Sequence, residues 1–281
     1  MQKLALYNKS YHEDVLGTKD LLESIYKYNC DNLNIIVSCP KNDRALFINT
    51  LGTENYELVN DEDYCQLKYI NGWASQTPIK LSAFKVLDSI NYLILDSDTF
   101  FIKDFFTDDF IAYGDTPFTI IHDHKQSQEY GFKFFKKEWD KTEFAKAQLA
   151  HREIFDGPKT KKIYDYGPNP HLFSSKVLKS LFFDLLEKNN MDIESLYLQI
   201  KQSFPEIHPR ETLIYNEFLL ANKIIDIVPT GPFFKSYLWK EVYDYENKNG
   251  FTDINLIRQN YLGVCVQTKH TNINKSVYLQ K

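Results

Sequence analysis

The sequence contains few cysteines, and the four that it has lie far apart, at Cys30, Cys39, Cys65 and Cys265. Their spacing matches no zinc-binding motif, so we expect reduced and mostly buried thiols. The sequence also lacks any apolar run near the roughly 18–20 residues that span a bilayer, and no basic-then-apolar leader opens it. These absences predict a cytoplasmic protein and leave open a peripheral contact with the inner face of a membrane.

An excess of positive charge is also missing. The chain has 33 Lys and Arg against 38 Asp and Glu, a formal net charge of −5. General nucleic-acid binding depends on clustered Lys and Arg that neutralise phosphates, so the composition argues against it. A negatively charged substrate would need a local device, either a metal ion or a few placed lysines.

The first third of the chain alternates between strand and helix patterns. We predict strands over residues 3–8, 33–40 and 56–60, and helices over 14–29 and 42–52. This alternation is typical of a parallel, doubly wound α/β sheet with right-handed crossovers. In such sheets ligands bind beyond the carboxyl ends of the strands.

One further helix and strand complete the alternation. Thr77 is suited to cap a helix whose first residue is Pro78. The apolar face of this helix is predicted to consist of Ile79, Ala83, Val86, Leu87 and Ile90. The helix leads into "YLILDSD", residues 92–98, a buried strand that runs straight into two carboxylates. Asp96 and Asp98 therefore lie at the carboxyl edge of the predicted sheet.

The second half of the chain is less regular. Residues 131–162 carry nine Lys and Arg against five Asp and Glu. Two interpretations stay open there: an amphipathic helix over 137–153 with a solvated face, or a surface for a phosphorylated or lipid-linked acceptor. We predict helices within 167–189 and over 209–223, a strand over 224–229, and a C-terminal strand ending at His270.

The Asp-Ser-Asp stretch allows three interpretations. The first is an exposed polar strand end. The second is the motif of a phosphohydrolase with Asp96 as the nucleophile, although Phe100 stands where that motif usually has Thr or Val. The third is a metal site. Residues i and i+2 of an extended strand point to the same side, so Asp96 and Asp98 are predicted to approach one cation. Carboxylate oxygens are the ligands that Mg²⁺ and Mn²⁺ prefer.

Several segments, taken together, resemble a family. "KSYHEDV", "VSCPKNDRALF", "NGWASQTPIKL", "YLILDSDTFFIKDF" and "RETLIYNEF" occur in this order in a little-characterised bacterial family that is grouped with GT-A glycosyltransferases and associated with polysaccharide biosynthesis. The resemblance covers most of residues 9–220. Relatives tend to show paired glutamines after the Trp, whereas this chain has only Gln76 nearby.

The resemblance implies a fold and an activity. The fold would be α/β, a GT-A-like (Rossmann-like) mixed sheet flanked by helices, in one catalytic domain over 1–281. Residues 1–105 or so would bind the nucleotide sugar and about 106–281 the acceptor. The activity would be metal-dependent transfer of a sugar from a nucleotide-sugar donor, by default a UDP-sugar, to a glycan or lipid-linked acceptor in capsule or lipopolysaccharide synthesis.

The resemblance also assigns roles to residues. A Mn²⁺ or Mg²⁺ ion would be held by Asp96, Asp98 and His270. Donor binding would involve Ser10, Tyr11, Trp73, Gln76, Lys80 and Asp96. Lys80 as an exposed helix lysine and Trp73 as ordinary core stay open as alternatives, and His122 and His124 are better explained by a polar turn.

An inverting transferase also needs a general base, commonly Asp or Glu. Glu211 matches the family's acidic position, with Glu217 as the second choice. The alternative for Glu211 is an acid favoured by the helix N-terminus. A retaining enzyme needs no such base. His171 either faces the acceptor or belongs to the core or a loop.

An alternative to an active transferase also stays open. The protein would then bind a sugar nucleotide without catalysing any transfer.

Overall fold

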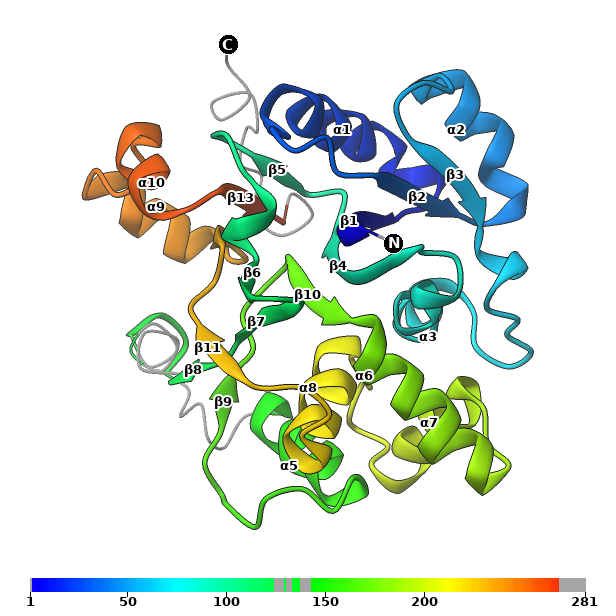
Figure 1. Cartoon of the computed structure of the whole chain (residues 1–281). Coiled ribbons are helices and arrows are strands. Elements are labelled where there is room, and N and C mark those ends of the chain that lie inside the picture. The colour runs from blue at the N-terminus through cyan, green and yellow to red at the C-terminus, as the bar shows by residue number, and fades with distance from the viewer. Residues whose placement is uncertain (1, 124–128, 130–132, 137–142, 268–281) are drawn as a thin grey trace.

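A computed structural model describes residues 2–123, 129, 133–136 and 143–267 of the chain. Its centre is a five-stranded sheet in the order β10-β4-β1-β2-β3 (Figure 1). β1 to β4 are parallel to one another, and β10 runs antiparallel beside β4. The strands are β1 (Gln2–Lys9), β2 (Ile35–Cys39), β3 (Glu57–Asn60), β4 (Ser89–Leu95) and β10 (His171–Ser174). The predicted α/β class, a mixed sheet flanked by helices, is therefore confirmed.

Alternate residues of β1 face the two layers of the core. Leu4 and Leu6 pack with α1 (Val15–Tyr28) and α2 (Arg44–Leu51) on one side of the sheet. Ala5 and Tyr7 face the other side, which is covered by helices from the rest of the chain. A strand buried on both faces is what the continuous apolar runs of the sequence predict for parallel strands.

Helix α3 and helices from the second half of the chain cover that other side. They are α3 (Gln76–Ser82), α6 (Ser175–Lys179), α7 (Ile193–Ser203) and α8 (Glu211–Asn222), and α5 (Glu143–Ile154) packs against α8. Figure 1 shows α5 to α8 gathered on the side of the molecule away from α1 and α2. Tyr215 of α8 stacks on Phe173 of β10 at a centroid distance of 4.1 Å, which ties α8 directly to the central sheet.

Three smaller sheets complete the fold. Their orders are β11-β7-β6, β12-β13-β5 and β8-β9. The strands are β5 (Thr99–Phe101), β6 (Ile111–Tyr113), β7 (Thr116–Ile120), β8 (His122–Asp123), β9 (Tyr164–Asp165), β11 (Val228–Thr230), β12 (Phe234–Tyr237) and β13 (Gly263–Val266), with helices α9 (Lys240–Lys248) and α10 (Ile254–Asn260) beside them. The pairing of β13 with β5 brings the last described strand next to the Asp-Ser-Asp stretch. No helix in the described part of the chain has the length and apolar character needed to cross a membrane.

Some predicted boundaries were wrong. The helix predicted to run to Ile90 ends at Ser82, and Ile90 belongs to β4. The helical periodicity continued because Ala83, Phe84 and Leu87 are buried after the helix has ended. The segment 171–174 is a strand before its helix begins, and α7, α9 and α10 were not predicted.

The strand into the two acids also ends earlier than predicted. β4 stops at Leu95, and residues Asp96–Thr99 form a turn closed by a 3.0 Å hydrogen bond from Thr99 N to Asp96 O. We call these four residues the acid turn. Asp96 and Asp98 are thus not alternate residues of an extended strand, and the argument that strand geometry aligns them was wrong.

Helix α1 packs tightly against the acid turn. A Cβ atom added at Gly17 would lie 2.5 Å from the carbonyl oxygen of Ser97, closer than real Cβ contacts come. Replacing glycine by alanine inside a helix usually adds up to about 1 kcal/mol of stability. We expect Gly17→Ala to have the opposite sign and to lower the free energy of unfolding in urea by about 1–3 kcal/mol.

The matched control is Lys19→Ala, on the exposed side of the same helix. It should leave the unfolding midpoint nearly unchanged. An unchanged or stabilised Gly17→Ala protein would show that the contact between α1 and the acid turn is loose.

Candidate functional site

The acid turn is held by segments that are distant in the sequence. The backbone N–H of Asp96 donates to the side chain of Asn169 at 2.9 Å, and the Thr99 hydroxyl donates to Asp96 O at 2.6 Å. Asp98 is held from β13, since Val266 N donates to its carbonyl oxygen at 2.9 Å and the Cys265 thiol lies 3.5 Å from its Oδ1. The backbone is fixed while both carboxylates stay partly exposed at the carboxyl edge of the sheet.

A buried lysine faces this turn from α3. Lys80 is 3% exposed, and its Nζ lies 2.7 Å from Asp96 Oδ1 and 2.9 Å from Glu211 Oε1. The alternative interpretation of Lys80 as an exposed helix lysine was wrong. Its predicted contact with the donor stays a prediction. We call Lys80, Asp96 and Glu211 the ion cluster.

Glu211 is the first residue of α8, and both of its oxygens are engaged. Oε1 accepts from Lys80, and Oε2 accepts from the hydroxyl of Thr77 at 3.1 Å. Burial would raise the pKa of Glu211, but the charge of Lys80, reinforced by His171, outweighs it and lowers the pKa to about 2. Burial likewise disfavours the charge on Lys80, yet Asp96 and Glu211 raise its pKa above the ordinary value. These two pKa shifts keep Lys80 and Glu211 charged at neutral pH.

A carboxylate with a pKa near 2 is a weak proton acceptor, because general bases work best with a pKa near the working pH. Glu211 as the catalytic base stays a prediction. Its contacts suit it better to fixing Lys80 and accepting a hydrogen bond.

The two other candidates around Glu211 have different surroundings. His171 of β10 lies opposite Ile94 of β4, and burial lowers the pKa of its imidazole to about 4 despite the nearby Glu211 and Asp96, so it is neutral at neutral pH. Glu217 is completely buried and receives two hydrogen bonds from Arg152, at 2.8 and 3.0 Å, and a third from Tyr166. Glu217 is therefore a structural acid that an acceptor hydroxyl cannot reach, and its choice as the second candidate base was wrong.

The residues predicted to bind the donor lie in several environments. Ser10 is buried, with its hydroxyl 2.8 Å from that of Thr18, whereas Tyr11 is half-buried. Gln76 begins α3 and is partly exposed. Trp73 is 64% exposed, so its alternative as ordinary core was wrong.

His270 is the histidine predicted to bind the metal, and it lies outside the described residues, as does His124. His122 begins the short strand β8, so the polar turn predicted there was wrong for this residue. Its Nε2 lies 3.9 Å from the carboxylate of Asp165. Within the described residues, no group of three or more His, Cys, Asp or Glu side chains could hold a metal ion. Any cation at the acid turn would thus have Asp96 and Asp98 as its described protein ligands.

Sequence reasoning missed a second polar network at the same edge of the sheet. Lys9, at the end of β1, pairs with Asp61 at 2.9 Å, and Asp61 accepts from the Ser38 hydroxyl. The Tyr64 hydroxyl lies 2.7 Å from Ser38 and 2.6 Å from the hydroxyl of Tyr7. All five side chains are buried. Lys9, Ser38 and Asp61 share a signal in the sequence, because each is a polar residue at or near the end of a strand.

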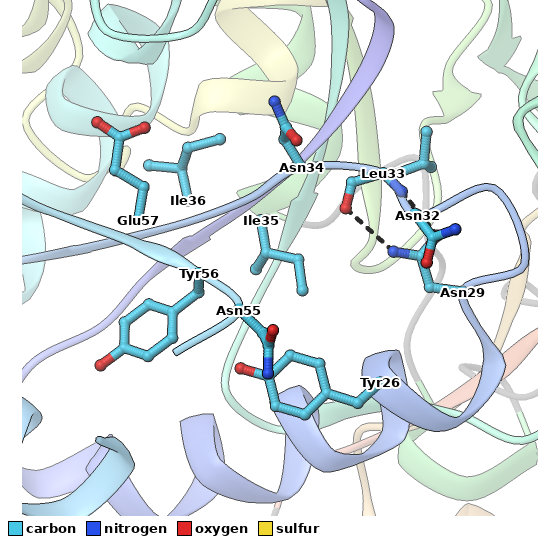
Figure 2. Close-up of a pocket in the computed structure, with 10 residues that line it drawn as sticks. All are labelled: Tyr26, Asn29, Asn32, Leu33, Asn34, Ile35, Ile36, Asn55, Tyr56 and Glu57. Carbon is cyan, nitrogen blue, oxygen red and sulfur yellow. Dashed lines mark hydrogen bonds between the residues drawn. The ribbon is translucent and has the colours of Figure 1, made fainter. Parts of the chain in front are cut away.

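A cavity of about 600 Å³ lies at the opposite edge of the sheet. It opens between the end of α1 and the beginnings of β2 and β3, as Figure 2 shows. Because parallel strands begin at one edge and end at the other, this cavity is separated from the acid turn by the length of the strands. It is lined by Tyr26, Asn29, Asn32, Leu33, Asn34, Ile35, Ile36, Asn55, Tyr56 and Glu57.

Comparison with protein families gives one match. The model of a family of unknown function, DUF6492, matches residues 3–167, which is more than half of the chain. The chain belongs to DUF6492. This match includes Lys80 and the acid turn but ends before Glu211, and no curated protein matches the chain.

Comparison with solved structures identifies the fold of this DUF6492 member. A crystal structure of the galactosyltransferase LgtC in complex with donor and acceptor sugar analogues has a TM-score of 0.53 to it at 13% identity, covering 94% of this chain and 87% of LgtC. A structure of LgtC with an active-site glutamine changed to glutamate gives the same values. The DUF6492 chain has the GT-A fold that LgtC shares.

The ion cluster generates a stability prediction. Lys80→Met leaves Asp96 and Glu211 next to each other without their cation, and removing one partner of a buried ion pair costs about 3–5 kcal/mol. We expect urea unfolding to show a loss of this size. The double variant Lys80→Met/Glu211→Gln should recover part of it, and Lys19→Met on the surface should change little. A Lys80→Met protein as stable as the wild type would contradict the cluster.

Two buried histidines predict sensitivity to acid. Burial lowers the pKa of His171, and that of His151 in α5, from the ordinary 6.5 to about 4. Between these values the unfolded chain binds more protons than the folded one, so the free energy of unfolding should fall as pH drops from 6.5 towards 4, by about 2 kcal/mol per histidine. His151→Gln should flatten this dependence in urea titrations at stepped pH, whereas the exposed His12→Asn should not. Equal slopes in all three proteins would refute the assignment.

Proposed function

We propose that this DUF6492 protein is a metal-dependent glycosyltransferase that transfers a sugar from a nucleotide-sugar donor to a glycan or lipid-linked acceptor. The observation that carries the proposal is the acid turn with its buried lysine, at the carboxyl edge of the sheet of a GT-A fold. Ligands of open α/β sheets bind at that edge. The donor's diphosphate would lie across it.

The residues at the acid turn fit a hard divalent cation in part. Asp96 and Asp98 offer carboxylate oxygens on a fixed backbone, and both are partly exposed, so a cation can reach them from solvent. The remaining ligands would be donor phosphate oxygens, and His270 stays a prediction. When bound, Mn²⁺ or Mg²⁺ would neutralise the charge that develops on the leaving nucleoside diphosphate.

Lys80 contributes a positive charge in addition to that of the metal ion, and this charge is a permanent part of the protein. Its ammonium group is fixed by Asp96 and Glu211 before any donor binds, so it needs no reorganisation as charge develops. A cation that shares Asp96 would leave Lys80 paired with Glu211. Glu211 would then hold Lys80 in place and accept a hydrogen bond from a hydroxyl of the sugar acceptor. These roles favour a reaction that does not require a strong carboxylate base.

The finer assignments rest on the sequence resemblance. A UDP-sugar as donor, bacterial capsule or lipopolysaccharide as the product, and a location at the inner face of the membrane are proposals of that kind. Ser10, Tyr11, Gln76, Lys80 and Asp96 remain the proposed donor contacts. The phosphohydrolase alternative loses support because the fold is GT-A, whereas an inactive sugar-nucleotide-binding protein is separated from an enzyme by turnover alone.

A thermal-shift screen of nucleotide sugars with and without Mn²⁺ tests the proposal. We expect one donor class to raise the melting temperature only when Mn²⁺ is present, because ligands that bind the folded state stabilise it. Asp98→Asn should abolish this metal-dependent shift and still give a folded protein. The matched control is Asp88→Asn, an exposed acid just before the opposite end of the same strand β4.

A metal-dependent shift that survives in both Asp96→Asn and Asp98→Asn would refute the acid turn as the metal site. A shift without sugar transfer or slow donor hydrolysis would identify the inactive binding protein instead.

A further inference from the structure

Trp73 is a large aromatic side chain that is exposed beside the ion cluster. It lies in a 3₁₀ turn, Gly72–Ser75, that leads directly into α3. Its indole contacts the ring of His208 edge to face, with centroids 5.8 Å apart and planes at 84°. We call Trp73 and His208 the aromatic shelf.

The aromatic shelf is continuous with the ion cluster. Trp73 lies in the 3₁₀ turn that leads into α3, and Thr77 and Lys80 lie about one turn apart within α3. On the facing segment, His208 contacts Trp73, Pro209 O accepts from Thr77, and Glu211 accepts from Thr77 and Lys80. The two segments therefore run side by side from an exposed aromatic pair down to a buried charge cluster.

The loop before the shelf is fixed by a buried acid. The carboxylate of Glu194, in the first turn of α7, accepts hydrogen bonds from three successive backbone N–H groups: Lys68 at 3.0 Å, Tyr69 at 2.7 Å and Ile70 at 2.9 Å. Glu194 is 4% exposed, and burying a carboxyl group is costly unless hydrogen bonds compensate for the lost water. The loop that carries exposed Tyr69 and leads to Trp73 is thus tied to α7 by these backbone hydrogen bonds.

We propose that the aromatic shelf is an acceptor subsite that binds a sugar ring of an oligosaccharide. The face of an aromatic ring packs against the apolar C–H face of a sugar, and a rigid, partly exposed indole offers such a face at little entropic cost. The terminal sugar would lie over Glu211, and the next ring would lie on Trp73. Trp73 thus belongs to the acceptor side, not to the donor pocket, and the acceptor has at least two sugar units. This inference rests on the proposed glycosyltransferase function.

Glu194 is a positioning residue in this proposal. It touches no substrate, but it fixes the path of residues 68–70 and thereby the approach to Trp73. A loop that was free to move would lose entropy each time a sugar bound, which would weaken binding.

Titrations without donor or metal test the subsite. The probes are methyl lactoside, methyl maltoside and methyl cellobioside, with methyl galactoside and methyl glucoside as single-ring controls, and tryptophan fluorescence is the signal. We expect a saturable change with at least one disaccharide and an affinity at least tenfold lower for the single rings. Trp73→Ala should abolish the change. Trp239→Ala should retain it, because Trp239 adjoins α9, which Figure 1 shows on the other side of the molecule from α3.

Glu194→Gln provides a second variant with an intact indole. We expect it to weaken disaccharide binding several-fold, while the Mn²⁺-dependent donor shift stays as in the wild type, because the donor lies at the acid turn. Tryptophan quenching by acrylamide should increase, as the segment carrying Trp73 becomes more mobile. Normal disaccharide affinity in a folded Glu194→Gln protein would remove Glu194 from the proposal.

The outcomes for the subsite and for the proposed function are distinguishable. A saturable response that persists in Trp73→Ala, or no response to any of the three disaccharides, overturns the aromatic shelf as a subsite. Disaccharide binding that requires Trp73, in a protein that shows no metal-dependent donor shift, supports the subsite and overturns the proposed transfer.

Discussion

The contact on which the site depends is the pairing of one buried ammonium group with two carboxylates from different parts of the chain. Lys80 comes from α3, Asp96 from the end of β4, and Glu211 from the start of α8. A buried charge without partners would be very costly, so the three segments are constrained to meet. These two ion pairs therefore connect segments that are distant in the sequence, and they also determine the charge at the carboxyl edge of the sheet.

Much of the fold could be predicted from the sequence because strands of the central sheet contain continuous apolar runs. The run 33–40 contains β2, and "YLIL" is the core of β4. Boundaries failed where burial continues past the end of an element, as it does from Ser82 to Leu87. The ion cluster could be predicted only in part, because the Lys80–Asp96 pair spans 16 residues whereas the Lys80–Glu211 pair spans 131.

Polar residues at the carboxyl edge form two clusters with different exposure. The network of Lys9, Asp61, Ser38 and Tyr64 is fully buried, whereas the ion cluster opens to solvent through Asp96. Satisfied buried networks rigidify their surroundings. The first cluster is thus suited to fix the ends of β1 to β3, and the second to meet a ligand. Pattern reasoning identified Asp96 because it interrupts an apolar run, and it overlooked Lys9 because a single lysine after a strand is unremarkable.

The position of β10 has a consequence for where this chain can be divided. The region matched by DUF6492 ends at residue 167, yet the strand that covers the side of β4 begins at His171. A protein shortened to the matched region would present the backbone of β4 as an open sheet edge, with Tyr92 and Ile94 deprived of Phe173 and Tyr215. Such an edge invites pairing between molecules. The boundary of the sequence family is therefore not a boundary of folding.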